Sequence, residues 1–217
     1  TMIDGFITNW ILLAGIFLLA LASPGHDLVM AVRNAMLHSR RAGLWTAAGF
    51  ALGVGIHVTY TLAGLATVIA HSVVLFNLIK YAGAAYLIYV GIKSLRSSGF
   101  TSDVSVHGPQ TTSLSDMQAL RAGFLTNLLN PKATIFFMAV FSQFITESTP
   151  LIVQILYAGT CIAMTFLWFS CVAFFLTQSR IRIMFLSASQ WIDRLCGGFL
   201  VALGIKLALT KGVSLTS

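Results

Sequence analysis

The chain consists largely of apolar runs long enough to cross a lipid bilayer, and their length leaves little choice of architecture. A helix rises about 1.5 Å per residue and the hydrocarbon layer is about 30 Å thick, so a span needs roughly 20 apolar residues. We predict spans at residues 6–32, 42–70, 73–92, 121–146, 150–178 and 190–210. Since 57% of the residues are hydrophobic and only 9% are charged, a soluble core could not hide them. We therefore expect an all-α polytopic membrane protein, with residues 1–217 forming a single transmembrane domain.

The formal net charge of +7 comes from basic residues that gather in alternate connections between the spans. Arginines and lysines follow the first span, flank the long polar segment and separate the last two spans, whereas the connections around His71 and Glu147 contain none. The positive-inside rule places the basic connections in the cytoplasm. Both termini should then lie outside the cytoplasm. This distribution favours a lipid bilayer as the partner of the chain and argues against nucleic acid.

An internal repeat divides the chain into two halves, residues 1–96 and 121–217, joined by a polar cytoplasmic loop at 97–120. The segment YLIYVGIK at 86–93 resembles FLVALGIK at 199–206, and FLLALASP at 17–24 resembles FLTNLLNP at 124–131. Because each half contributes an odd number of spans, the second half enters the membrane from the opposite side. We expect a 3+3 inverted repeat, with chance similarity between apolar helices as the alternative.

Each half carries one prolyl segment inside its first span, SPGHD at 23–27 and NPK at 130–132. Proline lacks the N–H that a helix interior needs, so we expect helices 1 and 4 of the six to be interrupted. Counted from the nearest arginines, both prolines lie roughly 13–15 Å from the cytoplasmic boundary, near the bilayer midplane. Ser23 and Asn130 are predicted N-caps, with Pro24 and Pro131 at the first helical position. Two simple helix kinks are the alternative.

Such breaks predict a site for a zwitterion. The free N–H groups of a half-helix N-terminus stabilise a carboxylate, and the carbonyls left at the end of the preceding half-helix accept from an ammonium group. The candidate substrate-binding or coupling residues surround the two breaks: Ser23, Pro24, Gly25, His26, Asp27, Asn127, Asn130, Pro131 and Lys132.

The two charged residues beside the breaks allow different roles. Asp27 either complements the dipole of a first helical turn or contacts a substrate ammonium group and carries a proton. Lys132 either pairs with Asp27 or a substrate carboxylate, or extends its ammonium group to water. Polar residues further away are secondary candidates: Asn34, His57, Lys80 and Thr134. The alternative for His57 is a hydrogen-bonded packing role, and for Lys80 it is extension of the ammonium group toward the outer interface.

Other chemistry finds little support in the residues. We expect no catalytic residues, no metal and no cofactor, since neither an HExxH nor a GxSxG motif occurs. A channel-like or structural membrane protein is the main alternative to a transporter, and an intramembrane enzyme is a weaker one. The GxxxG segment at 49–53 permits tight helix contact, either within the chain or in a homodimer.

These motifs resemble those of the LysE/RhtB family of bacterial amino-acid exporters. The resemblance rests on SPGHD at 23–27, RN at 33–34, RRAG at 40–43, KYAGAAYLIYVG at 80–91 and FLTNLLNPKA at 124–133. It departs at His26, where the family usually has a second proline. The resemblance implies a secondary transporter of the bacterial cytoplasmic (inner) membrane that expels amino acids or their derivatives by alternating access. A proton or another counter-ion is the expected coupling partner.

Overall fold

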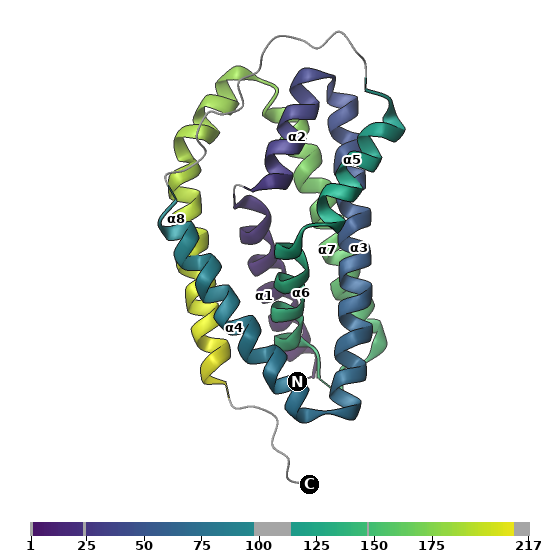
Figure 1. Ribbon diagram of the computed structural model, residues 1–217, viewed down its shortest axis with the longest axis vertical. Coiled ribbons are helices and arrows are strands. Elements are labelled where there is room, and N and C mark those ends of the chain that lie inside the picture. The colour runs from purple at the N-terminus through teal and green to yellow at the C-terminus, as the bar shows by residue number, and fades with distance from the viewer. Residues whose placement is uncertain (1, 24, 98–113, 147, 211–217) are drawn as a thin grey trace.

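The computed structural model describes residues 2–23, 25–97, 114–146 and 148–210, which form an all-helical bundle with no strand in these ranges (Figure 1). The helices are α1 (Met2–Ala22), α2 (His26–Leu37), α3 (Arg40–His71), α4 (Val73–Leu95), α5 (Asp116–Leu128), α6 (Pro131–Phe144), α7 (Leu151–Phe175) and α8 (Ser179–Leu209). Figure 1 shows α2 following α1, and α6 following α5, along the long axis of the bundle.

Several of these helices have the length and composition of membrane spans. Helices α1, α3, α4 and α7 each contain an apolar segment long enough to cross a bilayer, and α5 with α6 would make a further span bent by 59° at its break. Helix α8 carries Arg180, Arg182, Asp193 and Arg194 and is less apolar. The prediction of an all-helical polytopic membrane protein is confirmed.

Two helix starts differ from the prediction. Helix α5 begins at Asp116, inside the predicted loop 97–120, because Ser115 and Gln118 form a capping box in which each side chain accepts from the other residue's backbone N–H. Helix α8 begins at Ser179 instead of residue 190. The predicted start was too late because the first turns of the helix carry arginines that interrupt the apolar run. Residues 98–113 of the predicted loop lie outside the described residues.

The GxxxG segment serves a contact inside the chain. A Cβ on Gly49 of α3 would lie 2.2 Å from the carbonyl oxygen of Leu120, and a Cβ on Gly123 of α5 would lie 2.2 Å from that of Thr46. Gly53 faces Asn127 in the same way, with Asn127 Oδ1 2.7 Å from the position of a Cβ. The missing side chains therefore let α3 and α5 approach closely.

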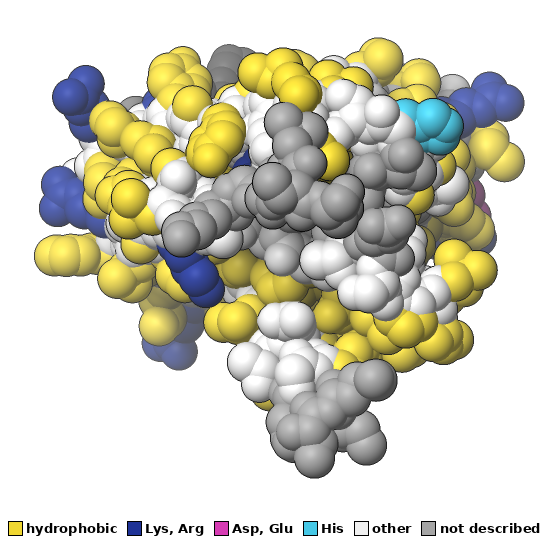
Figure 2. All heavy atoms as spheres, turned by 90° about the horizontal axis from the view of Figure 1, so that it is seen from below, with side chains coloured by type: hydrophobic (Ala, Val, Ile, Leu, Met, Phe, Trp, Pro, Cys, Tyr) yellow, Lys and Arg dark blue, Asp and Glu magenta, His cyan; other side chains and the backbone are white. Residues whose placement is uncertain are grey.

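Two hydrophobic clusters form the core of the bundle. One cluster includes Phe17 of α1 together with Phe137 and Phe141 of α6, and the other includes Phe50 of α3 and Phe169 of α7. Large apolar side chains also cover the outside of the bundle, including Leu209, which is 78% exposed. Seen from the end of the bundle where α8 ends, hydrophobic side chains dominate the periphery (Figure 2). Lipid contact accounts for such a surface.

Candidate functional site between the two helix breaks

The first break separates α1 from α2 without a side-chain cap. Ser23 still follows α1, because its N–H donates to the Leu19 carbonyl at 3.0 Å. Helix α2 begins at His26 with Gly25 as its N-cap in extended conformation and with no side-chain cap hydrogen bond. The prediction of Ser23 as N-cap is therefore wrong, and Pro24 lies outside the described residues. The first-turn N–H groups of α2 need other acceptors.

The second break is capped as predicted. Asn130 Oδ1 accepts from the Lys132 N–H at 3.0 Å, and Pro131 occupies the start of α6. The Asn127 carbonyl, at the end of α5, lies 2.9 Å from His57 Nε2 and also accepts from the Asn130 N–H at 3.0 Å. The Asn127 carbonyl is thus satisfied although Pro131 cannot donate to it.

A hydrogen bond joins the two breaks. Asn127 Nδ2 donates to Asp27 Oδ2 at 2.8 Å, and the Asn130 side chain also interacts with Asp27. Asp27 Oδ1 and Asn127 Oδ1 are buried and have no protein partner among the described residues. Since Asn127 Oδ1 lies against Gly53, Asp27 Oδ1 is the acceptor at this junction that could receive a donor such as an ammonium group.

A small cavity of about 100 Å³ lies at this junction. Apolar side chains and the polar groups of both breaks share its lining: Phe17, Phe136, Phe137, Phe169, Ser23, Gly25, His26, Asp27, Asn127, Asn130 and Lys132. His26 is exposed and lies close enough to Asp27 for electrostatic attraction. An apolar wall with a few convergent polar groups is typical of a ligand site.

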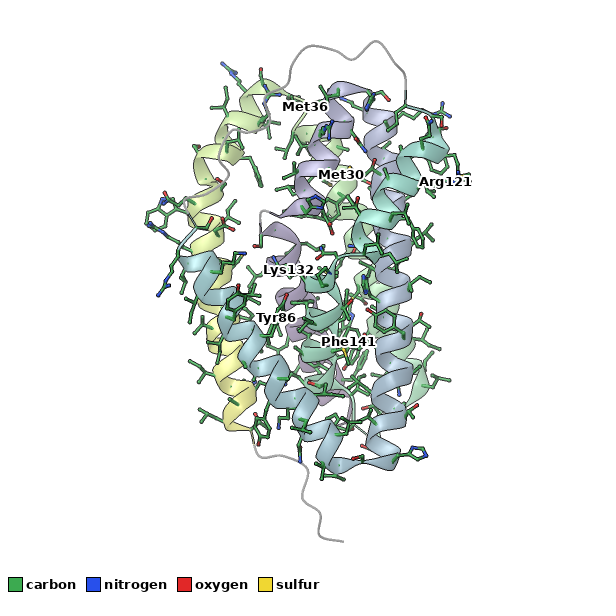
Figure 3. The ribbon with its side chains drawn as sticks, in the orientation of Figure 1. Met30, Met36, Tyr86, Arg121, Lys132 and Phe141 are labelled. Atoms are coloured by element: carbon green, nitrogen blue, oxygen red, sulfur yellow. The ribbon has the colours of Figure 1, made fainter. Side chains whose placement is uncertain are left out.

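Lys132 links this small cavity to a larger one. Its side chain is exposed although it lies in the middle of the bundle, and Figure 3 shows it on α6 at nearly the height of Tyr86 on α4. The ammonium group is attracted by both Asp27 and Asp193. Asp27 takes Asn127 as its hydrogen-bond partner, so Lys132 stays available to both cavities.

The larger cavity has a volume of about 880 Å³ and lies between α4, α8 and the two breaks. Its lining includes Tyr86, Lys93 and Arg96 from α4 and its end, Lys132 from α6, and Asp193 from α8. Pockets that bind small molecules usually measure about 300–1,000 Å³, so the volume of this cavity suits an amino acid.

Sequence reasoning missed Asp193. The residue is only 4% exposed, and its Oδ2 accepts from the Ser97 hydroxyl at 2.7 Å. Its neighbour Arg194 and the arginines at the start of α8 made this stretch resemble a connection facing water. The available signal was an acidic residue three positions after residue 190, where the sixth span was predicted to begin.

Two of the secondary candidates lie at the second break. His57 is buried, and its ring contacts the Asn127 carbonyl on one side and the Tyr60 hydroxyl on the other. Tyr60 also donates to Thr134 Oγ1 at 2.8 Å. His57 and Thr134 therefore belong to a polar network between α3 and the break.

The other two secondary candidates lie away from the junction. Asn34 Nδ2 donates to Thr46 Oγ1 at 3.0 Å and ties α2 to α3. Lys80 Nζ donates to the Thr210 carbonyl at 2.8 Å, at the C-terminal end of α8. A lysine at a helix C-terminus satisfies carbonyls that lack an intrahelical partner. The structure does not bring Asn34 or Lys80 to the junction with Asp27.

Known proteins resemble the chain over most of its length. The chain is 30% identical over 198 residues to the threonine efflux protein of Escherichia coli (strain K12), covering 91% of this chain and 96% of that protein. It is 36% identical over 137 residues to the homoserine/homoserine lactone efflux protein of Salmonella typhimurium (strain LT2), covering 63% of this chain and 65% of that protein. It is also 30% identical over 193 residues to the uncharacterized membrane protein YrhP of Bacillus subtilis (strain 168), covering 86% and 92%.

No solved structure matches the chain. The family model described as LysE type translocator matches residues 18–211, a range that includes both breaks and α8. Together with the relatives that align over nearly the whole chain, this match makes the protein a transporter and not an enzyme. The chain belongs to the LysE family of translocators.

Proposed function

We propose that the chain exports amino acids or their derivatives across the bacterial cytoplasmic (inner) membrane, by alternating access around the junction of the two breaks. The observation that carries the proposal is the hydrogen bond between Asn127 and Asp27, which joins one break to the other. The relatives named threonine efflux protein and homoserine/homoserine lactone efflux protein support the same class of substrate.

The architecture behind this proposal is a pair of inverted three-span halves. In the first half α1 with α2 makes one interrupted span, followed by α3 and α4, and in the second half α5 with α6 is followed by α7 and α8. Corresponding helices pack together, α3 with α7 and α4 with α8. Gly91 and Gly197 permit the second contact, since a Cβ on either would lie within 2.7 Å of the other's carbonyl oxygen. Inverted repeats of this kind place substrate near the bilayer midplane.

The chemistry of the junction suits an amino acid. Asp27 presents its unpartnered Oδ1 to the ammonium group, while Lys132 and the first-turn N–H groups of α2 attract the carboxylate. Phe17 and Phe137 line the apolar part of the cavity, where a side chain would pack. Proton coupling would use Asp27, the carboxylate in direct contact with both the opposite break and the cavity.

The larger cavity represents the entry from the cytoplasm. Lys93 and Arg96 stand at its wall, and basic residues mark the cytoplasmic side of a membrane protein. In Figure 1 the end of α4 lies near the height of the first break, while the starts of α3, α5 and α8 gather at one end of the bundle and the end of α8 lies at the other. In this orientation both termini lie outside the cytoplasm.

The experiment is radiolabelled flux in proteoliposomes that contain the purified protein. We expect saturable movement of L-threonine or L-homoserine that an excess of the other amino acid inhibits and that a pH gradient accelerates. A channel-like protein would give flux that rises linearly with concentration and shows no competition. Saturable flux without any response to the pH gradient would support the proposed export of amino acids but would contradict proton coupling. Empty liposomes are the control.

A further inference from the structure

The larger cavity contains a carboxylate that belongs to neither helix break. Asp193 lies in the middle of α8, is 4% exposed and lines the cavity together with Ser23 and Lys132. The Ser97 hydroxyl at the end of α4 donates to Asp193 Oδ2 at 2.7 Å, and the Ser23 side chain also interacts with Asp193. This carboxylate is therefore held in place by groups from two other segments of the chain.

The charges around Asp193 match a zwitterion. Lys132 is attracted by Asp193 and by Asp27, and it lines both cavities. Lys93 also lines the larger cavity and repels Lys132. Burying a carboxylate at this depth costs free energy unless a cation or a ligand compensates for it. A cavity of amino-acid size lined by one acid, Asp193, and three cations, Lys93, Arg96 and Lys132, offers partners for both charged ends of such a ligand.

We propose that Asp193 and Ser97 form a second substrate subsite, which receives the ammonium group of an amino acid entering from the cytoplasm before it reaches Asp27. The substrate carboxylate meets Lys132, which is shared with the junction of the breaks. Ser23 and Gly25 line both cavities and form the passage between them. This inference rests on the proposed function and adds a second acidic residue to it.

The test is the Asp193→Asn variant, which keeps the shape of the side chain and removes its charge. L-threonine is offered on the side of the membrane that corresponds to the cytoplasm. We expect the KM for its flux to rise about tenfold, the effect of losing one charge-assisted contact. The maximal rate and the unfolding temperature should stay near those of the unmodified protein, and Asp193→Glu should restore part of the KM. The charge-matched control is Asp116→Asn, which removes a carboxylate that pairs with Arg41 outside both cavities and should leave KM unchanged.

Three results separate this inference from its alternatives. Unchanged KM in Asp193→Asn, with saturable flux in the unmodified protein, overturns the subsite. A raised KM with a lowered unfolding temperature that Asp193→Glu does not restore assigns Asp193 to the α4–α8 contact and also overturns it. If Asp193→Asn fails to fold, Ser97→Ala takes its place, and a KM unchanged in that variant rejects the subsite. Absence of saturable flux in the unmodified protein rejects the proposed function itself.

Discussion

Asp27 is held by a contact that leaves half of its carboxylate unused. Oδ2 accepts from Asn127, while the buried Oδ1 has no protein partner among the described residues. Burying a carboxylate without full compensation costs free energy, which supports the proposed role of Asp27 in transport. Asn127 orients the carboxylate across the break, and Lys132 supplies a positive charge beside it.

Asp27→Asn should abolish flux driven by a pH gradient and leave folding largely intact. The amide oxygen of asparagine still accepts from Asn127 Nδ2, so the contact between the breaks survives, whereas the amide carries no exchangeable carboxyl proton. The measurements are flux in proteoliposomes with an imposed pH gradient and thermal unfolding in detergent. Flux equal to that of the unmodified protein would remove Asp27 from the coupling step.

The cap at the second break was predictable because helix capping depends on local sequence. Asn130 caps α6 as expected, since an asparagine before a proline favours a helix start. Asp193 was not predictable, because its partner Ser97 is 96 positions away in the chain and only packing brings them together. Ser23 failed as a cap because backbone hydrogen bonding of α1 extends to it.

The bend between α5 and α6 is the helix feature on which the site depends most. Pro131 provides no N–H to the Asn127 carbonyl four positions earlier, so the helix cannot continue through the break. The resulting 59° bend sets the direction of α6 and of Lys132 on its first turn. A continuous helix would turn Lys132 away from the two cavities.

Pro131→Ala should lower flux about tenfold, which corresponds to a free-energy difference of about 1.4 kcal/mol. Alanine restores the N–H and favours a straight helix, so Lys132 leaves its position between the cavities. The matched control is Pro150→Ala at the start of α7, remote from the junction. Equal flux in both variants would show that the bend does not depend on the proline.

Gly49→Ala should destabilise the protein by about 1–3 kcal/mol, the usual cost of overpacking. The new Cβ would lie 2.2 Å from the Leu120 carbonyl oxygen and 2.6 Å from the Phe124 nitrogen, so α3 and α5 must separate. Gly64→Ala on the same helix is the control, because a Cβ there meets no atom within 4 Å. Thermal unfolding in detergent compares the two, and equal unfolding temperatures would contradict the close contact.

Helix positions were easier to predict from the sequence than helix ends and helix partners. The apolar runs placed α3, α4 and α7 closely, because about 20 apolar residues are a physical requirement for a span. The starts of α5 and α8 lie in polar sequence and were missed. The GxxxG segment left an internal contact and a dimer equally open, and only the position of Gly123 opposite Gly49 identified the partner.

Unequal packing between the halves explains where the larger cavity lies. Helix α4 packs tightly against α6, where a Cβ on Gly83 would lie 2.7 Å from that of Ala139, whereas the corresponding pair in the proposed repeat, α8 and α2, makes little contact. The space beside the first break is therefore open, and Asp193 faces it. The sequence predicted two equivalent halves and contained no sign of this difference, which arises from packing.

Ser94→Cys should react with a membrane-impermeant maleimide only from the side of the membrane on which the basic connections lie. L-threonine should slow the reaction. Ser94 lines the larger cavity, and the background carries Cys171→Ala because Cys171 is exposed. Ser148→Cys, in the connection at the opposite end, is the control and should react from the other face. Labelling of both variants from the same face would contradict this orientation of the cavity.

Equilibrium binding of radiolabelled L-threonine to the detergent-solubilised protein shows whether residues of both breaks form one amino-acid site. The unmodified protein should bind with a single saturable isotherm. Asp27→Asn, from the first break, and Lys132→Gln, from the second, should each weaken binding about ten- to hundredfold, as expected for one charged contact of about 1.5–3 kcal/mol. Saturable binding that neither variant weakens would contradict the account, because the substrate would then bind elsewhere.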